Sequence, residues 1–287
     1  MLDRKVFILA LACLSLAQTG CFSRRGGTVG PFPKPYVPGT VVFVSTRDEG
    51  KGEIYSMLDD GTQVTRLTFN AVQEAAPCLS PDGTKITFRR ELNPSNVFVM
   101  NVDGSSAIGL APGKRAEWSP DGSKLALVAE SLAVMNSDAT GIHRFGVGAS
   151  YVTWSPDGSK LAYVSNGVGG QSLHDIYTIN PNGTGAQRIT SDQGAKHSLS
   201  WSPDGTRLVY STSQAVIVIR VDGGALPTAP CVGMDSRWSP DGQRIIFVTN
   251  AYDGNEEIYS VRLDGTDLKN MSQNVADESE PDWGPRQ

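Results

Sequence analysis

The sequence is poor in the residue types that most often carry catalysis or cross-links. It has three histidines and four cysteines in 287 residues, which is too few cysteines for the disulfide framework of a small secreted domain. It has no Gly-x-Ser-x-Gly segment, the pattern typical of the nucleophile turn in α/β hydrolases. The longest apolar run near the start, from Val6 to Leu14, is shorter than the roughly 20 residues that span a bilayer. We therefore do not expect an enzyme, a disulfide scaffold or a membrane-spanning helix.

An excess of positive charge is also missing. The chain has 25 Lys and Arg residues against 30 Asp and Glu residues, a formal net charge of −5. Proteins that bind nucleic acid need a basic surface to neutralise phosphates. We therefore predict no nucleic-acid partner.

The first residues have the features of a secretory signal peptide, which we place at residues 1–20. Arg4 and Lys5 precede the apolar run. Residues 17–21, Ala-Gln-Thr-Gly-Cys, resemble the bacterial lipobox, although Gln18 departs from the usual apolar residue. This resemblance implies diacylation of Cys21, and Phe22 in place of Asp favours the outer membrane, facing the periplasm. The alternative is an ordinary cleaved signal peptide with an incidental cysteine.

Residues 21–40 are rich in Gly and Pro at a density that neither strands nor helices tolerate. We interpret them as a tether between an anchor and a folded body.

An internal repeat dominates the rest of the chain. The tetrapeptide Ser-Pro-Asp-Gly occurs five times, and all five tryptophans occupy one repeat position. Four of them directly precede the tetrapeptide, and the fifth, Trp283, lies in a truncated last copy. Within each unit, alternating apolar segments such as residues 160–164 are separated by Asp-Gly or Asn-Gly turns. Four short strands per unit of about 40 residues indicate a propeller blade.

Counting these units predicts an all-β, six-bladed β-propeller over residues 41–287. Residues 41–45 match the strand that follows each turn, but no tryptophan precedes them. Residues 280–283 supply the missing inner strand, so the N- and C-terminal strands should pair and close the ring. The Ser-Pro-Asp-Gly turns and the tryptophans are explained by turn geometry and by packing between blades, and we assign them no catalytic role.

Four motifs recur in a fixed order: Trp-Ser-Pro-Asp-Gly, Glu/Asp-Ile-Tyr, Asp-Gly-Thr and Arg-Leu-Thr. In these motifs the chain resembles the WD40-like repeat of the TolB-type β-propellers, over residues 41–287. The resemblance is specific for fold but not for function, because one fold can carry many activities. TolB, a periplasmic part of a cell-envelope complex, has an α/β domain before its propeller, where this chain has the predicted tether.

The mouth of the central channel is the expected functional site. Residues three to five positions before each tryptophan should line it, and they differ in every blade, as a recognition surface would. The predicted partner-binding residues are Glu74, Arg115, Tyr151, His197, Asp235 and Glu280.

We predict that the channel site has no cofactor, and the alternative is that it binds a metal ion. The resemblance includes polysaccharide lyases that hold a metal with several channel histidines, but here only His197 is expected in the channel, while His143 and His174 are placed in loops. Two acidic clusters contain oxygen ligands suited to Ca²⁺: residues 277–282, and Asp253 with residues 256–257. We predict no catalytic or metal-binding residue, with calcium as the alternative. Cys78 and Cys231 enter blades that do not adjoin, so we expect them to be unpaired.

The leading hypothesis is a non-enzymatic cell-envelope lipoprotein, with a monomeric propeller that binds a protein partner through its channel face. The rival hypothesis is an enzyme or binding protein for a carbohydrate or a peptide, with a metal in the channel.

Overall fold

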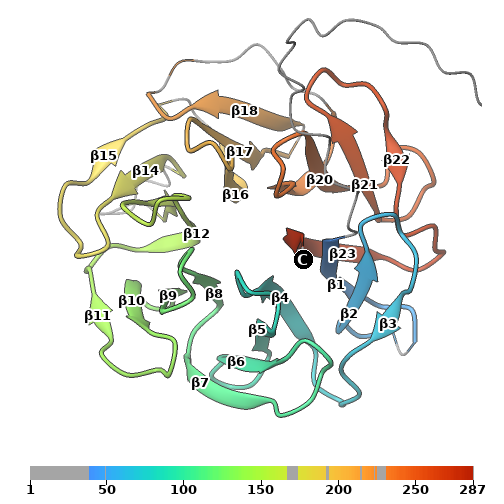
Figure 1. The fold of residues 1–287 in the computed structure, drawn as a ribbon, viewed down its shortest axis with the longest axis horizontal. Helices are drawn as coiled ribbons and strands as arrows, with labels where there is room; N and C mark the ends of the chain where they lie inside the picture. Colours follow the sequence, from blue (N-terminus) through green and yellow to red (C-terminus); the bar gives the residue numbers. More distant parts are fainter. Residues whose placement is uncertain are drawn as a thin grey trace, which may run out of the picture. The chain divides into compact units, whose positions relative to one another are not determined.

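The computed structural model describes residues 39–48, 50–166, 174–191, 194–213, 215–222, 224 and 231–286. The predicted signal peptide, Cys21 and nearly all of the predicted tether lie outside these ranges. In the described residues, 23 strands form six antiparallel sheets arranged as a ring (Figure 1). The predicted six-bladed propeller is therefore confirmed. No helix in this part of the chain is long and apolar enough to cross a membrane.

Each sheet is one blade, with its strands ordered from the axis of the ring outward. Blade 1 contains β23 (Glu278–Arg286), β1 (Gly39–Ser45), β2 (Glu53–Leu58) and β3 (Thr65–Arg66). Blade 2 contains β4 (Glu74–Leu79), β5 (Lys85–Arg90), β6 (Asn96–Asn101) and β7 (Ile108–Pro112). Blade 3 contains β8 (Arg115–Trp118), β9 (Lys124–Val128), β10 (Leu132–Asn136) and β11 (His143–Arg144).

The remaining three blades follow the same plan with one exception. Blade 4 contains β12 (Ala149–Trp154), β13 (Leu161–Ser165), β14 (Ile176–Ile179) and β15 (Gln187–Arg188). Blade 5 contains β16 (His197–Trp201), β17 (Arg207–Ser211) and β18 (Val216–Arg220). Blade 6 contains β19 (Met234–Trp238), β20 (Arg244–Thr249), β21 (Glu257–Arg262) and β22 (Lys269–Asn270). In the described residues, a single bridge between Val216 and Cys231 replaces the fourth strand of blade 5.

The two ends of the propeller chain close the ring, as predicted. Strand β1 pairs on one side with β2 and on the other with β23, and Val41 lies opposite Trp283. Figure 1 shows the first and last strands side by side in blade 1. This pairing removes the two free sheet edges that an open chain of blades would expose.

The Ser-Pro-Asp-Gly turns are held by their own side chains. In blade 3, Ser119 Oγ donates to Asp121 Oδ1 at 2.6 Å, and Lys124 N donates to Ser119 Oγ at 2.9 Å. Gly122 has a φ of 70° in this turn, which a residue with a side chain rarely adopts. The turn therefore has a structural explanation at each position.

The tryptophans pack between adjacent blades. Trp283 joins Phe43 and Tyr55 of blade 1 to Ile246 of blade 6 in one buried cluster. Four of the five indoles are at most 9% exposed, whereas Trp118 is half-buried. The core of the molecule is thus divided among the blade interfaces, which is why each blade depends on its neighbours.

The Glu/Asp-Ile-Tyr and Arg-Leu-Thr motifs fasten strands within a blade. In blade 1, Thr68 Oγ1 donates to Glu53 Oε2 at 2.6 Å, and Ile54 N donates to Thr68 Oγ1 at 2.9 Å. Arg66 also reaches Glu53, at 3.3 Å. Both motifs therefore serve the fold.

Candidate functional site

The innermost strands define two faces of the ring. Each strand runs toward its Ser-Pro-Asp-Gly turn, so these turns all lie on one side, the turn face. The opposite side, the mouth face, carries the starts of β4, β8, β12, β16, β19 and β23. The ring order follows the chain, because neighbouring innermost strands contact one another from β23 through β4 and β8 to β19. Alternate residues of a regular strand share one side, and in β8, which has no register shift, this places Arg115 and Glu117 on the side of the axis together.

A small cavity near the axis, the central well, collects the residues three positions before the tryptophans. Its volume is about 10 Å³, which corresponds to room for about one water molecule. The residues that line it are Arg115, Tyr151, Ser198, Asp235, Arg237, Glu280 and Pro281.

An ion pair across the ring closes one side of the well. Arg115 Nη2 of blade 3 lies 2.8 Å from Glu280 Oε1 of blade 1, and the Arg115 guanidinium lies 4.9 Å from the centre of the Tyr151 ring. Glu280 N donates to Asp235 Oδ2 at 3.2 Å, and Ala76 N donates to Glu280 Oε2 at 2.7 Å. All six blades thus contribute a residue to this small site when Ser198 of blade 5 is included.

The electrostatics of the well favour an added positive charge. Burial raises the pKa of Asp235, and the neighbouring Glu280 carboxylate raises it further. Arg115 lowers it, but by less than these two effects raise it. The carboxyl of Asp235 is therefore incompletely compensated by the residues around it.

A second charged layer lies below the well, formed by residues one position before the tryptophans. Arg237 Nη2 of blade 6 lies 2.5 Å from Glu117 Oε1 of blade 3, the blade directly across the ring. Arg237 also donates to Leu199 O at 2.7 Å and lies 3.7 Å from Asp282. Cys78 Sγ donates to Glu117 Oε2 at 3.3 Å. The channel is consequently bridged by buried ion pairs and does not form an open pore at this depth.

Four of the innermost strands contain a bulge at the level of the well. The bulged residue has a positive φ of 49° to 53° in each case: Ala76, Ser198, Asp235 and Glu280. The strand register shifts at the same places. A bulge turns the affected side chain away from the regular alternation, and here it brings Asp235 and Glu280 to the axis.

The structure brings together four of the six residues predicted at the channel mouth: Arg115, Tyr151, Asp235 and Glu280. The other two, Glu74 and His197, do not line the well. Glu74 is fully buried in blade 2, where its carboxylate accepts hydrogen bonds from Arg90 and Asn70. His197 is exposed at the start of β16.

Glu74 and His197 lie outside the well because of their positions in the innermost strands. The well is lined from the repeat position three residues before the tryptophan, which Arg115 and Glu280 occupy in blades 3 and 1. In blades 2 and 5 this position belongs to Ala76 and Ser198. Glu74 precedes Ala76 by two residues, and His197 precedes Ser198 by one. The residues missed were Glu117 and Arg237 in the lower layer. The two-residue alternation of a strand, applied to the position just before each tryptophan, would have found them.

The carboxylates of the two acidic clusters that could bind calcium form hydrogen bonds with different residues of the protein. Glu278 accepts from Ser45 and Arg47, and Asp282 accepts from Leu79 N. Asp277 accepts from Glu256 N. In the described residues, no group of three or more histidine, cysteine or carboxylate side chains is arranged to hold a metal ion. His143 is exposed and His174 is half-buried. Cys78 and Cys231 do not form a disulfide with each other.

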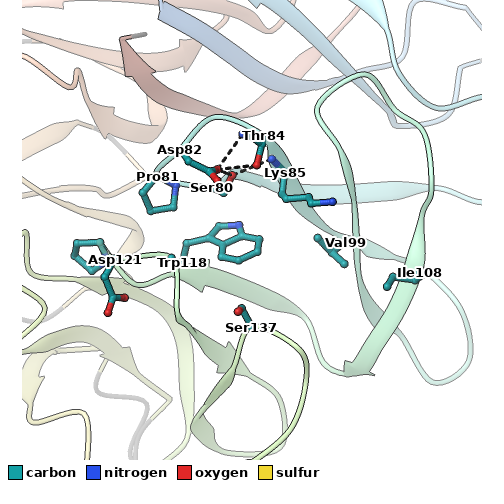
Figure 2. Close-up of a pocket in the computed structure, with 12 residues that line it drawn as sticks. Ser80, Pro81, Asp82, Thr84, Lys85, Val99, Ile108, Trp118, Asp121 and Ser137 are labelled. Carbon is teal, nitrogen blue, oxygen red and sulfur yellow. Dashed lines mark hydrogen bonds between the residues drawn. The ribbon is translucent and has the colours of Figure 1, made fainter.

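A larger groove of about 620 Å³ lies between blades 2 and 3 on the turn face (Figure 2). Trp118 forms its floor, with Pro81 on one side and Val99 and Ile108 on the other. Asp82, at its rim, accepts hydrogen bonds from Ser80 and Thr84 of its own turn (Figure 2). Similar grooves occur between blades 3 and 4 and between blades 4 and 5. The three grooves are lined by corresponding residues of the repeat, namely the Ser-Pro-Asp-Gly turns of two neighbouring blades and the tryptophan between them.

Exposed apolar side chains accompany the well on the mouth face. Phe69, in the loop from β3 to β4, is 75% exposed, and Val275, in the loop from β22 to β23, is 96% exposed. Tyr252, Leu92 and Met234 are also exposed in loops or strand ends of this face. Together they provide apolar contact area around a polar centre.

No family model matches the chain, and no curated protein matches it. Among solved structures, TolB from Acinetobacter baumannii superposes with a TM-score of 0.73 at 17% identity, covering 86% of this chain and 67% of TolB. A putative TolB from Agrobacterium tumefaciens gives 0.63 at 17% identity, covering 82% and 89%. Kuenenia stuttgartiensis hydrazine synthase gives 0.66 at 12% identity, covering 86% and 47%. The chain has the fold of a TolB-like six-bladed β-propeller.

Proposed function

We propose that this protein is a non-enzymatic scaffold of the bacterial cell envelope that binds a protein partner through its mouth face. The observation that carries the proposal is the well itself. Arg115, Tyr151, Asp235 and Glu280 differ from blade to blade, yet they converge on one point at the axis. Residues that the fold requires are the same in every blade. Side chains that differ between blades and still meet at one place are therefore suited to recognition.

Two further features support protein binding over catalysis. The well has a volume of about 10 Å³ and is closed below by the Arg237–Glu117 ion pair, so a substrate would have little room beside these side chains. The exposed Phe69 and Val275 on the same face offer apolar contact area, which protein interfaces combine with a polar rim.

The proposed location rests on the sequence before the propeller. A signal peptide at residues 1–20 and a lipid on Cys21 would attach the chain to a membrane, with the outer membrane as the proposed site. Strand β1 begins at Gly39 on the turn face, opposite the mouth face.

The test is a comparison of proteins captured from envelope extracts by wild type and by a Phe69→Ser, Val275→Ser variant. Both side chains are exposed, so the free energy of unfolding should change by no more than about 0.5 kcal/mol each. We expect the variant to lose a captured protein by at least tenfold in quantitative mass spectrometry.

The matched control is Ile108→Ser, because Ile108 is 60% exposed on the turn face. It should capture the same proteins as wild type. Loss of capture in the control but not in the mouth-face variant would contradict the proposal.

A further inference from the structure

The central well has the size of one ammonium group. Its volume of about 10 Å³ admits about one water-sized group. An ammonium is a compact group of that size, whereas the planar guanidinium of arginine has three nitrogen atoms and needs more space. The cavity is therefore selective by size among the cationic side chains.

Among the charged groups that line the well, the carboxyl of Asp235 is left without an ion-pair partner in the described residues. Asp235 and Glu280 contribute two carboxylates, and Arg115 contributes one guanidinium, which contacts Glu280 at 2.8 Å. Arg237 is already paired with Glu117 at 2.5 Å in the lower layer. Within the described ranges, Asp235 forms no ion pair, and its carboxylate accepts a hydrogen bond from the neutral Glu280 N–H at 3.2 Å.

The well is accessible from the mouth face. The Glu280 side chain is 22% exposed and Asp235 is half-buried, so the well is not sealed from solvent. A lysine side chain carries its charge at the end of four methylene groups, which allows it to enter a narrow opening while its backbone stays outside. Tyr151 and Ser198 complete the wall; the Tyr151 ring contacts the Arg115 guanidinium, and the Ser198 hydroxyl is hydrogen-bonded to Ser211 and Ser236, so the carboxylates are the groups left for a ligand.

We propose that the central well is a binding site for the side-chain ammonium of a lysine on the protein partner, held by Asp235 and Glu280. This inference rests on the proposed protein-binding function and specifies the chemistry that the mouth face recognises. Burial raises the pKa of Asp235, as does Glu280, which agrees with a carboxylate that gains from a bound cation.

The experiment titrates ¹⁵N-labelled propeller with N-acetyl-lysine-N-methylamide and follows the backbone amide resonance of Glu280. This amide donates to Asp235, so it reports directly on that carboxylate. We expect a saturable shift in the millimolar range, and at least tenfold weaker binding of the norleucine and arginine analogues.

Two variants test the assignment to Asp235. Asp235→Asn should weaken binding of the lysine analogue at least tenfold, and asparagine tolerates the φ of 50° at this position, so the fold should persist. Glu130→Gln removes an exposed carboxylate from the β9–β10 loop on the same face and should bind as wild type does.

Three results would overturn the proposal: equal shifts with norleucine, unchanged binding in Asp235→Asn, or tighter binding of glycylglycine amide, which would indicate a chain terminus instead of a lysine. The titration contains no partner protein. Its failure would therefore leave the capture experiment with Phe69 and Val275 intact, and failure of the capture experiment would leave this result intact.

Discussion

The aspartates of the Ser-Pro-Asp-Gly turns act at the scale of single residues. Hydrogen bonds from Ser119 and from Ser123 lower the pKa of Asp121 to about 2, and the corresponding bonds from Ser155 and Ser159 lower the pKa of Asp157 to about 2. The bond from Ser80 likewise lowers the pKa of Asp82. A carboxyl with a lowered folded-state pKa stabilises the fold above its unfolded pKa of about 3.9. That contribution is lost as the pH falls toward 2.

We therefore predict that turn aspartates contribute to acid unfolding. In an Asp82→Asn, Asp121→Asn, Asp157→Asn variant, the free energy of unfolding should change less between pH 4 and pH 2 than in wild type. Urea unfolding at a series of pH values measures this difference. Glu130→Gln serves as the control and should keep the wild-type slope. Equal slopes in the triple variant and wild type would contradict the assignment.

The carboxyls of the channel have the opposite effect. Burial raises the pKa of Asp235, and burial also raises that of Asp282, although Arg237 opposes it. A raised folded-state pKa stabilises the fold when the group is protonated, and this stabilisation is lost as the pH rises through that pKa. Ionisation of Asp235 and Asp282 as the pH rises therefore lowers the free energy of unfolding.

At the scale of the strand elements, the turns between the third and fourth strands pack against the preceding blade. Gly104, between β6 and β7, has a φ of 84°, and a Cβ at this position would lie 2.3 Å from the Leu67 carbonyl oxygen of blade 1. Gly122 has a similar φ of 70° but has nothing within 4 Å of such a Cβ. A comparison of substitutions at these two glycines therefore distinguishes the cost of the backbone conformation, which both share, from the cost of the close contact, which only Gly104 has.

We predict that Gly104→Ala is more destabilising than Gly122→Ala. The left-handed conformation costs alanine about 1–2 kcal/mol in both variants. In Gly104→Ala, the collision with Leu67 adds about 1–3 kcal/mol, because the backbone of one blade must move. Thermal or urea unfolding of the two proteins measures the difference, and equal losses would show that the blades adjust freely at this contact.

At the scale of the whole molecule, the ring is held across its axis as well as around its circumference. Arg237 and Glu117 belong to opposite blades and are 120 residues apart in the sequence. Arg115 and Glu280 join blades 3 and 1, which are separated by blade 2. Removing one partner of a buried pair leaves the other charge buried without compensation, which typically costs about 3–5 kcal/mol.

Arg237→Met should therefore reduce the free energy of unfolding by about 3–5 kcal/mol. Arg220→Met is the matched control, because both side chains of the Arg220–Asp222 pair are 58% exposed, and exposed ion pairs contribute little to stability. Urea unfolding of both variants measures the contrast. Similar small losses would mean that the pair across the channel does not stabilise the ring.

The repeat alone predicts most of the fold. The tryptophan before four of the five Ser-Pro-Asp-Gly turns and the Asp-Gly or Asn-Gly pairs at most hairpins are local signals, and they are repeated often enough to count the blades. The closure of the ring was also predictable, since residues 41–45 lacked an inner strand and residues around Trp283 lacked the rest of a blade.

The sequence by itself determined the six blades, the closure at β1 and β23, and four residues of the central well. Only the tertiary structure decided that Glu74 and His197 lie outside the well, because the sequence repeat leaves open which of the residues three to five positions before each tryptophan reach the axis. Only the tertiary structure paired Arg237 with Glu117. That contact depends on the curvature of the complete ring, and no local pattern of residues encodes which side chains will meet across it.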